Sequence, residues 1–205
     1  MLLDFSRQEK IFRDYSLKRP KTVLAKTFSE AKKAADKIKK PLVLKIYSQK
    51  HLHRTDVGGV VTGVESVQEL KESYNRLMKI PAVQGVLIQE QIKGYEFVMG
   101  VKEDEVFGKF IMLGTGGVMV ELFNDVSFKL LPFSKKDADE MLKEIKGSVL
   151  LKGFRGGEVI DEKILTDTLL NVGKMAVQED IKDADFNPVI VNSRGAFFCD
   201  AKISV

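Results

Sequence analysis

The stretch PLVLKIYSQKHLHRTDVGGVVTGV, residues 41–64, decides the fold class, because it joins two β-rich runs through a polar loop that ends in a double glycine. Lys45 lies inside the first apolar run. An unpaired buried ammonium is costly, so its amine must either reach an edge of the sheet or meet a negative ligand. Glycine permits close approach of backbone N–H groups to a bound group, so Gly58 and Gly59 form either a simple turn or part of a phosphate-binding loop. The sequence contains no Walker motif of the form G-x-x-x-x-G-K-[ST].

The same loop holds the only two histidines of the sequence, His51 and His53. His53 is open to roles as a metal ligand, a general base or a phosphoryl acceptor, because imidazole titrates near neutrality and its free nitrogen is nucleophilic. The alternative is a structural or solvent-facing histidine. A metal site is the weakest of these interpretations, since only Asp56 lies nearby and the sequence has no CxxC or HExxH motif.

Composition excludes several classes of protein. With 205 residues, 44% of them hydrophobic, the chain can bury a core in one domain or two small subdomains. It has 33 basic and 29 acidic residues, a net charge of +4 and a pI near 9.0, and the two signs are interspersed, which argues against a nucleic-acid partner. No apolar run approaches the roughly 20 residues of a membrane span, and the start MLLDFSRQEK lacks the order of a signal peptide. We therefore expect a cytoplasmic protein with no membrane partner, in which the single cysteine, Cys199, is a buried structural thiol.

Capping sequences and hydrophobic periodicity predict the order of elements. TFSE (27–30), SVQE (66–69) and SKKD (134–137) each predict a helix start, and apolar spacing predicts a further helix over 161–178. Between them lie β-rich runs, and the order predicts an α+β fold in two lobes. The proline and glycine of KIPAVQG, residues 79–85, favour a junction there, with lobes of residues 1–82 and 83–205.

Two further stretches are candidate binding elements. DADFNPVIV and AFFCDAKI predict a hairpin that places Asn187 and Asp200 on neighbouring strands, where an amide oxygen and a carboxylate suit Mg²⁺. The alternative is that Asn187 caps a turn and Asp200 faces solvent. IMLGTGGVMVEL holds Gly114, Gly116 and Gly117, which form either a glycine hairpin or a wall of a ligand cleft that Glu121 would face.

Five blocks together resemble the β subunit of ADP-forming acyl-CoA synthetases, the ADP-forming acetate–CoA ligases. They occur in the same order as in that family and cover nearly the whole chain: PLVLKIYSQKHLHRTDVGGVVTGV, VLIQEQIKGYEFVMGVKED, FGKFIMLGTGGVMVELFNDVSFKL, LLKGFRGGEVID and DADFNPVIV with FCDAKI. The resemblance implies an ATP-grasp fold, in which two α+β lobes close on a nucleotide.

The resemblance also implies a role for individual residues. Lys45 would hold ATP phosphate, Glu90 would lie at the adenine-binding hinge and Glu96 would face the ribose. Asn187 and Asp200 would bind Mg²⁺ beside ATP or ADP. His53 would carry the phosphoryl group transiently, and Lys45, Arg54 and backbone N–H groups, including those near Gly58, Gly59, Gly116 and Gly117, would neutralise and align phosphate charge. His51 stands where the family usually has an apolar residue, which makes it incidental in this interpretation.

The implied reaction is acyl-CoA + ADP + phosphate ⇌ carboxylic acid + ATP + CoA. A separate CoA-binding α subunit would form the acyl phosphate in a hetero-oligomer such as α₂β₂. The sequence departs from the family at Lys109, where proline is usual, and at Lys129, where arginine is usual, and Arg155 of FRGG resembles the family's YRG without an assigned role. The alternative function is a non-catalytic ATP-grasp module that binds nucleotide or regulates a partner.

Overall fold

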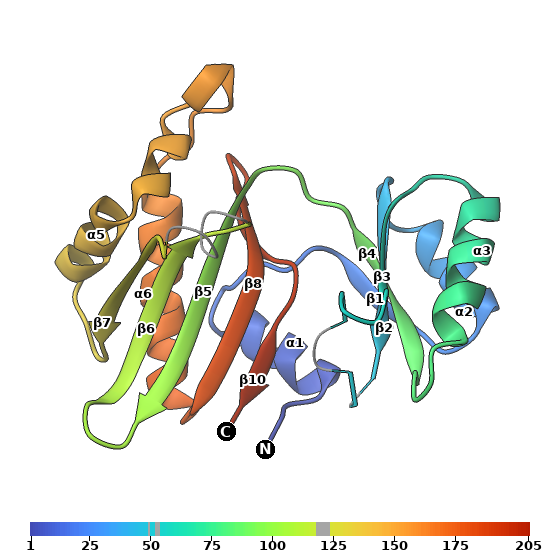
Figure 1. The fold of residues 1–205 in the computed structure, drawn as a ribbon, viewed down its shortest axis with the longest axis horizontal. Helices are drawn as coiled ribbons and strands as arrows, with labels where there is room; N and C mark the ends of the chain where they lie inside the picture. The colour runs from blue at the N-terminus through green and yellow to red at the C-terminus, as the bar shows by residue number, and fades with distance from the viewer. Residues whose placement is uncertain (49, 52–53, 118–123) are drawn as a thin grey trace. The chain divides into compact units, whose positions relative to one another are not determined.

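Two antiparallel sheets organise the chain, and each belongs to a separate unit (Figure 1). The computed structural model describes residues 1–48, 50–51, 54–117 and 124–205. The larger unit consists of Met1–Arg19 and Lys93–Val205, and the smaller unit is Pro20–Ile92. The expected boundary at residue 82 does not coincide with this division, because the strand that follows residue 82 pairs within the smaller unit.

The smaller unit is a four-stranded sheet with helices on one face. Its strands follow the order β1-β4-β2-β3. Helices α2 and α3 cover one face and contribute their alanine, leucine and tyrosine side chains to a core shared with β2 and β4. The element bounds are β1 (Thr22–Ala25), α2 (Phe28–Ala35), β2 (Leu42–Tyr47), β3 (Val60–Val64), α3 (Val67–Met78) and β4 (Gly85–Glu90).

All three predicted capping sequences begin a helix. The side chain of Thr27 accepts a hydrogen bond from the backbone N–H of Glu30, 3.2 Å away, at the start of α2. Ser66 before α3 and Ser134 before α5 (Lys135–Glu144) each form a reciprocal capping box with the acidic residue three positions later. These bonds satisfy N–H groups that a first helical turn leaves unpaired, so the prediction is confirmed with its physical reason.

The larger unit is a six-stranded sheet in the order β10-β8-β5-β6-β7, with β9 also paired to β8. Helices α1, α5 and α6 contribute to the core on one face of this sheet. The predicted helix over 161–178 is present as α6. The element bounds are α1 (Phe5–Asp14), β5 (Tyr95–Asp104), β6 (Gly108–Thr115), β7 (Val126–Leu130), the 3₁₀ helices η1 (Lys146–Leu151) and η2 (Phe154–Gly156), α6 (Lys163–Gln178), β8 (Asp183–Asn192), β9 (Gly195–Phe198) and β10 (Lys202–Ser204).

The first helix, α1, belongs to the larger unit although it precedes the smaller unit in sequence. Phe12 of α1 packs edge-to-face against Phe186 and Phe198, with ring centroids 6.1 and 5.1 Å apart. All three rings are almost completely buried. The aromatic cluster therefore joins the N-terminal segment to the last strands of the chain.

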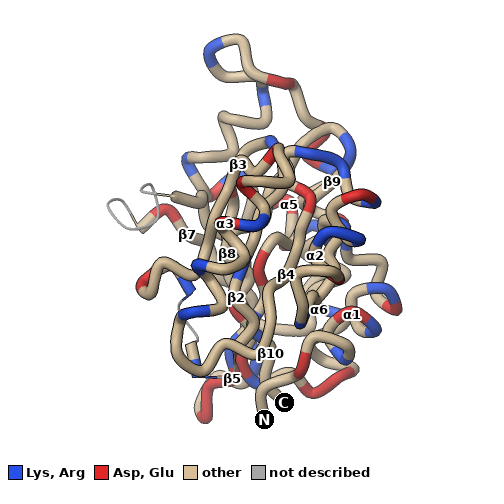
Figure 2. Tube along the Cα trace, turned by 90° about the vertical axis from the view of Figure 1, so that its right-hand side faces the viewer, with Lys and Arg blue, Asp and Glu red and all other residues tan. Residues whose placement is uncertain are grey.

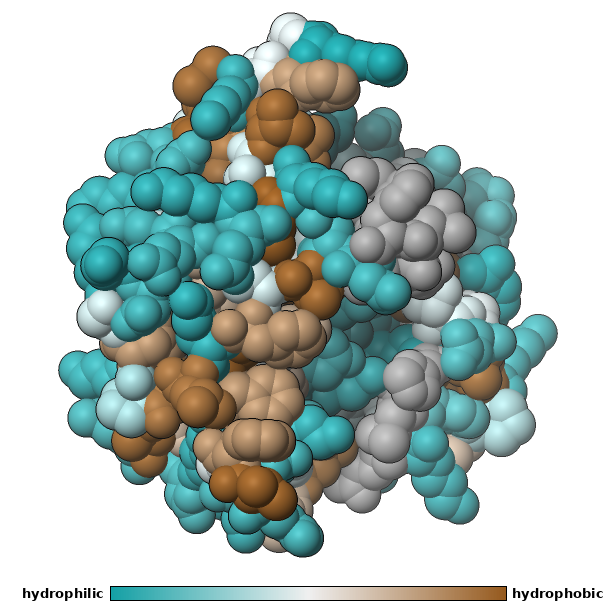
Figure 3. All heavy atoms as spheres, turned by 60° about the vertical axis from the view of Figure 1, so that its left-hand side comes forward, coloured by the Kyte–Doolittle hydropathy of each residue, from teal (hydrophilic) through white to brown (hydrophobic). Residues whose placement is uncertain are grey.

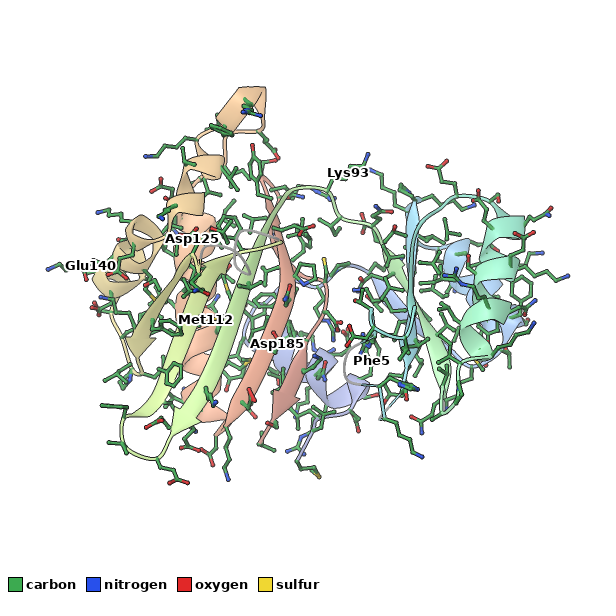
Figure 4. All side chains as sticks on the ribbon, viewed as in Figure 1. Phe5, Lys93, Met112, Asp125, Glu140 and Asp185 are labelled. Carbon is green, nitrogen blue, oxygen red and sulfur yellow. The ribbon has the colours of Figure 1, made fainter. Side chains whose placement is uncertain are left out.

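The face of the larger sheet opposite its helices carries apolar side chains on β6 and β7 and a carboxylate, Asp185, on β8. On β6 and β7, Phe110 and Phe128 form an edge-to-face pair, and Phe128 is 52% exposed. On β5, Gly100 is flanked by Met112 and Asp185, both labelled in Figure 4. Apolar patches also interrupt the mostly hydrophilic surface in the view of Figure 3.

Basic and acidic residues alternate along the trace in Figure 2, as the sequence pattern indicates. Cys199 is buried, which confirms its predicted environment. Among the described residues, no helix combines the length and the apolar character that a membrane span requires.

Candidate functional site

Lys45 is a buried cation on the sheet face that the helices leave uncovered. Its neighbours in β2, Leu44 and Ile46, point into the core under α2 and α3, so the alternation of strand side chains places Lys45 on the opposite face. It pairs with Val60 of β3 and Leu87 of β4, and it is only 7% exposed. Because β2 lies between β4 and β3, Lys45 is not on an edge strand, and its binding of a negative ligand stays a prediction.

The double glycine closes the loop between β2 and β3. The N–H of Gly59 donates to the carbonyl oxygen of Arg54 at 2.8 Å, and the N–H of Ile46 donates to the carbonyl oxygen of Gly59 at 2.9 Å. A Cβ at Gly59 would lie 2.6 Å from the Ile46 side chain, so this position requires glycine. A Cβ at Gly58 would meet no atom within 4 Å. Glycine is favoured there because its backbone has a φ of +65°, which other residues rarely adopt.

Glu90 ends β4 close to the point where the chain leaves the smaller unit. Its N–H donates to the carbonyl oxygen of Lys21 at 2.9 Å, and it pairs with Leu42 of β2. Ile92 is the last residue of the smaller unit. The role of Glu90 at an adenine-binding hinge stays a prediction.

Glu96, Gly116 and Gly117 come together in the larger unit. The N–H of Gly116 donates to the carbonyl oxygen of Glu96 at 2.7 Å, and a Cβ at Gly116 would lie 2.7 Å from the Cβ of Glu96. Gly117 has a φ of +66°, and a Cβ there would lie 3.6 Å from a carboxylate oxygen of Glu96. The exposed Glu96 carboxylate thus lies beside a glycine turn that leaves it accessible.

Asp125 is a buried carboxylate to which the sequence interpretation assigned no role. Its carboxylate accepts three hydrogen bonds, from the Thr115 hydroxyl at 2.5 Å, the N–H of Lys146 at 2.7 Å and the N–H of Gly147 at 2.8 Å. Burial disfavours the charged form, but these donors outweigh it and hold the pKa of the Asp125 carboxyl below its ordinary value. Asp125, labelled in Figure 4, therefore joins the end of β6 and the start of β7 to the start of η1. The sequence offered one signal, an aspartate directly before an apolar strand.

Asn187 and Asp200 occupy corresponding positions along the backbone of the hairpin. β9 and β10 pair with β8 in one common register, shown by Val189 opposite Phe198 and Asp185 opposite Lys202. Continuing that register through the interruption brings Asn187 opposite Asp200. The prediction that Asp200 lies on a strand is wrong, because residues 199–200 form a bend between β9 and β10.

The same two residues are suited to a hard cation. Asn187 lies in a bulge of β8, where Phe97 pairs with Val189 and Met99 pairs with Phe186. A bulge redirects side chains at the end of a ladder. Within the described ranges, no cluster of three or more His, Cys, Asp or Glu side chains could hold a metal ion. An amide and a carboxylate fit Mg²⁺, which takes few protein oxygens when phosphate and water supply the others.

Of the other residues singled out from the sequence, some lie outside the described residues and others have defined positions. His53 and Glu121 lie outside the described residues. Arg54 is half-buried, and its backbone closes the loop described above. Arg155 has a left-handed backbone with φ 52° and stacks on Phe154, with 5.4 Å between its guanidinium carbon and the ring centroid.

Two of the departures from the family pattern, Lys109 and Lys129, are ion-paired lysines. Lys129 on β7 lies 3.1 Å from Glu140 and 3.8 Å from Glu144 of α5. Lys109 on β6 pairs with Asp180. Both lysines hold elements of the larger unit together, which gives them a structural explanation.

Comparison with known proteins defines the class. A family model described as an ATP-grasp domain matches residues 1–205, and the chain therefore belongs to the ATP-grasp family. Two similar relatives within this family are ADP-forming acetate–CoA ligases. The chain is 42% identical over 206 residues to the ADP-forming acetate–CoA ligase II of Archaeoglobus fulgidus, with 100% of this chain and 30% of that protein covered. It is 37% identical to the β subunit of the ADP-forming acetate–CoA ligase II of Pyrococcus furiosus, covering 95% of this chain and 88% of that subunit.

Solved structures give the same result. The acetyl-coenzyme A synthetase 1 of Ca. Korarchaeum cryptofilum, in complex with coenzyme A and Ca-AMPCP, has a TM-score of 0.92 at 37% identity and covers 100% of this chain and 93% of that chain. In another structure of that enzyme, with coenzyme A and Mg-AMPPCP, a phosphohistidine segment points towards the nucleotide-binding site. That structure has a TM-score of 0.84 at 34% identity and covers 100% of this chain and 92% of that chain. The expected ATP-grasp fold is confirmed.

Proposed function

We propose that this chain is the nucleotide-binding part of an ADP-forming acyl-CoA synthetase and transfers a phosphoryl group between a phosphohistidine and ADP or ATP. The observation that carries the proposal is the similarity to a β subunit of such an enzyme along 95% of this chain and 88% of that subunit. The buried Lys45 adds a physical reason, because a cation on the sheet face opposite the helices suits a phosphate ligand.

The transfer needs a nucleophile and charge neutralisation. The neutral imidazole nitrogen of His53 attacks the γ-phosphorus of ATP, an N–P bond forms, and the bond from that phosphorus to the β–γ bridging oxygen breaks to release ADP. In the opposite direction, ADP attacks the phosphohistidine and regenerates ATP. Lys45 and Arg54 neutralise phosphate charge, and the N–H groups beside Gly58 and Gly59 orient the phosphates.

The remaining residues hold the nucleotide. Glu90 contacts the adenine from the end of β4, and Glu96 binds the ribose hydroxyls beside Gly116 and Gly117. Asn187 and Asp200 hold Mg²⁺, which supplies electrostatic stabilisation of the phosphates when bound. The strand register on both sides, which when continued brings Asn187 opposite Asp200, supports this assignment.

The partner is a CoA-binding α subunit or an equivalent domain. The chain spans 30% of the length of the Archaeoglobus relative and 88% of the Pyrococcus β subunit. The name of the Pyrococcus relative implies a separate α subunit, and we infer that the CoA-dependent half of the reaction belongs to such a subunit in a hetero-oligomer or to an equivalent fused domain.

Incubation with [γ-³²P]ATP and Mg²⁺ tests the function. We expect acid-labile labelling of the full chain that His53→Asn abolishes, because the labelled nitrogen is lost. Lys45→Met should weaken ATP binding at least tenfold, since it removes the buried cation. Lys71→Met on the exposed surface of α3 is the matched control and should label as the unmodified chain does.

Two results would contradict the proposal. Labelling that persists in His53→Asn would remove His53 from the transfer. Tight ATP binding with no acid-labile label in the unmodified chain, with or without a CoA-binding α subunit, would support the alternative of a non-catalytic nucleotide-binding module.

A further inference from the structure

Asn192, the last residue of β8, is a buried polar residue to which the sequence interpretation assigns no role. It is 6% exposed. Its Nδ2 donates to the carbonyl oxygen of Lys93 at 2.8 Å, and its Oδ1 accepts the N–H of Arg194 at 2.9 Å. A carbonyl oxygen only accepts and an N–H only donates, so these two partners fix the orientation of the amide. The Asn192 side chain therefore connects two segments of the larger unit that lie far apart in the sequence.

The bond to Lys93 continues the pairing of β5 with β8 past the start of β5. Tyr95, the first residue of β5, pairs with Val191 of β8. Lys93, labelled in Figure 4, precedes Tyr95 by two positions. Between them, the backbone of Gly94 packs so closely on β8 that a Cβ would lie 2.3 Å from the carbonyl oxygen of Val191. Because strand ends fray unless they are held, the Asn192 amide stabilises the end of the sheet at which β5 begins.

Glu96, the expected ribose contact, is the second residue of that strand. Phe97 and Met99 lie in the core shared with the helices, so the alternation of strand side chains places Glu96 on the opposite face of the sheet. The N–H of Gly116, which follows β6, holds the carbonyl oxygen of Glu96 at 2.7 Å, and Asn192 holds the start of the same strand on the β8 side. The direction of the exposed carboxylate therefore depends on a strand end that Asn192 helps to fix.

We propose that Asn192 is a positioning residue for ribose recognition by Glu96, through its hydrogen bond to the carbonyl oxygen of Lys93. The inference rests on the proposed function, because it takes Glu96 as the ribose contact. Hydrogen bonds from ribose hydroxyls to a carboxylate weaken steeply when distance and angle change. Asn192 therefore contributes to the preference for a nucleotide that carries ribose hydroxyls, and not to the binding of its phosphates.

A purely structural role for Asn192 makes a different prediction. Its Oδ1 accepts the N–H two residues on, as in an Asx turn, and this bond shapes the turn between β8 and β9. Asn192→Asp separates the two roles, because the carboxylate keeps an acceptor for the Arg194 N–H but turns an oxygen toward the carbonyl oxygen of Lys93. If the turn alone mattered, Asn192→Asp would recognise ribose as the unmodified chain does.

Equilibrium binding of ATP and of 2′,3′-dideoxy-ATP, each with Mg²⁺, measures the effect. The unmodified chain should bind ATP more tightly, and Asn192→Asp and Asn192→Ala should lower that preference about two- to tenfold, the size of one net hydrogen bond. The affinity for dideoxy-ATP should change less than twofold. Glu96→Ala should abolish the preference, and Asn192→Asp added to it should have no further effect on it. Asn75→Ala, on the exposed surface of α3, is the matched control and should keep the full preference.

Three results would overturn the positioning role. They are an unchanged preference for ATP in Asn192→Asp, an equal weakening of both nucleotides in that variant, and a further loss of preference when Asn192→Asp is added to Glu96→Ala.

The same measurements separate this inference from the proposed function. If the unmodified chain acquires the acid-labile label but binds the two nucleotides equally, the phosphoryl transfer stands, whereas ribose recognition by Glu96 and its positioning by Asn192 fall. If the unmodified chain binds neither nucleotide and acquires no label, the proposed function and the positioning role fall together.

Discussion

At the scale of single residues, the buried carboxylate of Asp125 connects two segments of the larger unit through hydrogen bonds. It is 5% exposed, and three donors from two different segments satisfy its carboxylate. One of the donors, the N–H of Gly147, comes from a position where a Cβ would overlap the Thr115 hydroxyl oxygen. The same contact therefore excludes a side chain at residue 147 and fixes Thr115, the residue directly before Gly116.

Asp125→Asn should destabilise the protein by about 1–3 kcal/mol at neutral pH, because an amide group turns a donor toward backbone N–H groups. Urea denaturation measures the change. The folded pKa of Asp125 lies below its unfolded value of about 3.9, so its contribution is complete above that pH and is lost as the pH falls through the folded pKa. The stability difference between the two proteins should hold from pH 5 to 8 and narrow below pH 4. Exposed Glu105→Gln makes the same change in charge and should show little difference at pH 7; an equal loss in both variants would refute the assignment.

At the scale of elements, local chemistry explains the helices well and the last strands poorly. The capping sequences at Ser66 and Ser134 predict helix starts that the structure confirms, because a cap is a contact between residues three apart. AFFCDAKI predicts one continuous strand, whereas the structure breaks it at residues 199–200. That break faces a bulge in β8, and a bulge arises from long-range register that periodicity along one strand does not contain.

Ser66→Ala should destabilise the protein by about 0.5–2 kcal/mol, since it removes the acceptor for the Glu69 N–H at 3.1 Å and disrupts the capping box. Thermal unfolding measures the loss. Ser66→Gly should cost less, because glycine is also favoured at this position. Ser6→Ala, within α1, is the control and should change stability by less than about 0.5 kcal/mol. A loss in Ser6→Ala as large as in Ser66→Ala would exclude capping as the cause.

At the scale of the whole molecule, the sequence predicts two α+β units but not how the chain is shared between them. The predicted break at residue 82 follows proline and glycine, which mark a turn. The structure instead assigns β4 to the smaller unit and α1 to the larger one. Both assignments depend on contacts between distant residues, such as Phe12 with Phe186, which no local signal reveals. Lys45 and Asp125 differ in the same way, because the burial of Lys45 could be predicted from its apolar strand, whereas the hydrogen bonds of Asp125 come from residues 115, 146 and 147.

Because each unit has its own hydrophobic core, we expect a core mutation to lower the local stability mainly of the unit that contains it. Leu77 of α3 is fully buried in the core of the smaller unit, and Leu169 of α6 is fully buried in the core of the larger unit. Replacement of either leucine by alanine should cost about 2–5 kcal/mol, because it removes buried methyl groups and leaves a cavity. Hydrogen exchange should then accelerate mainly in Pro20–Ile92 for Leu77→Ala, and mainly in Met1–Arg19 and Lys93–Val205 for Leu169→Ala. Equal acceleration throughout the chain in both variants would instead show that the units open as one cooperative structure.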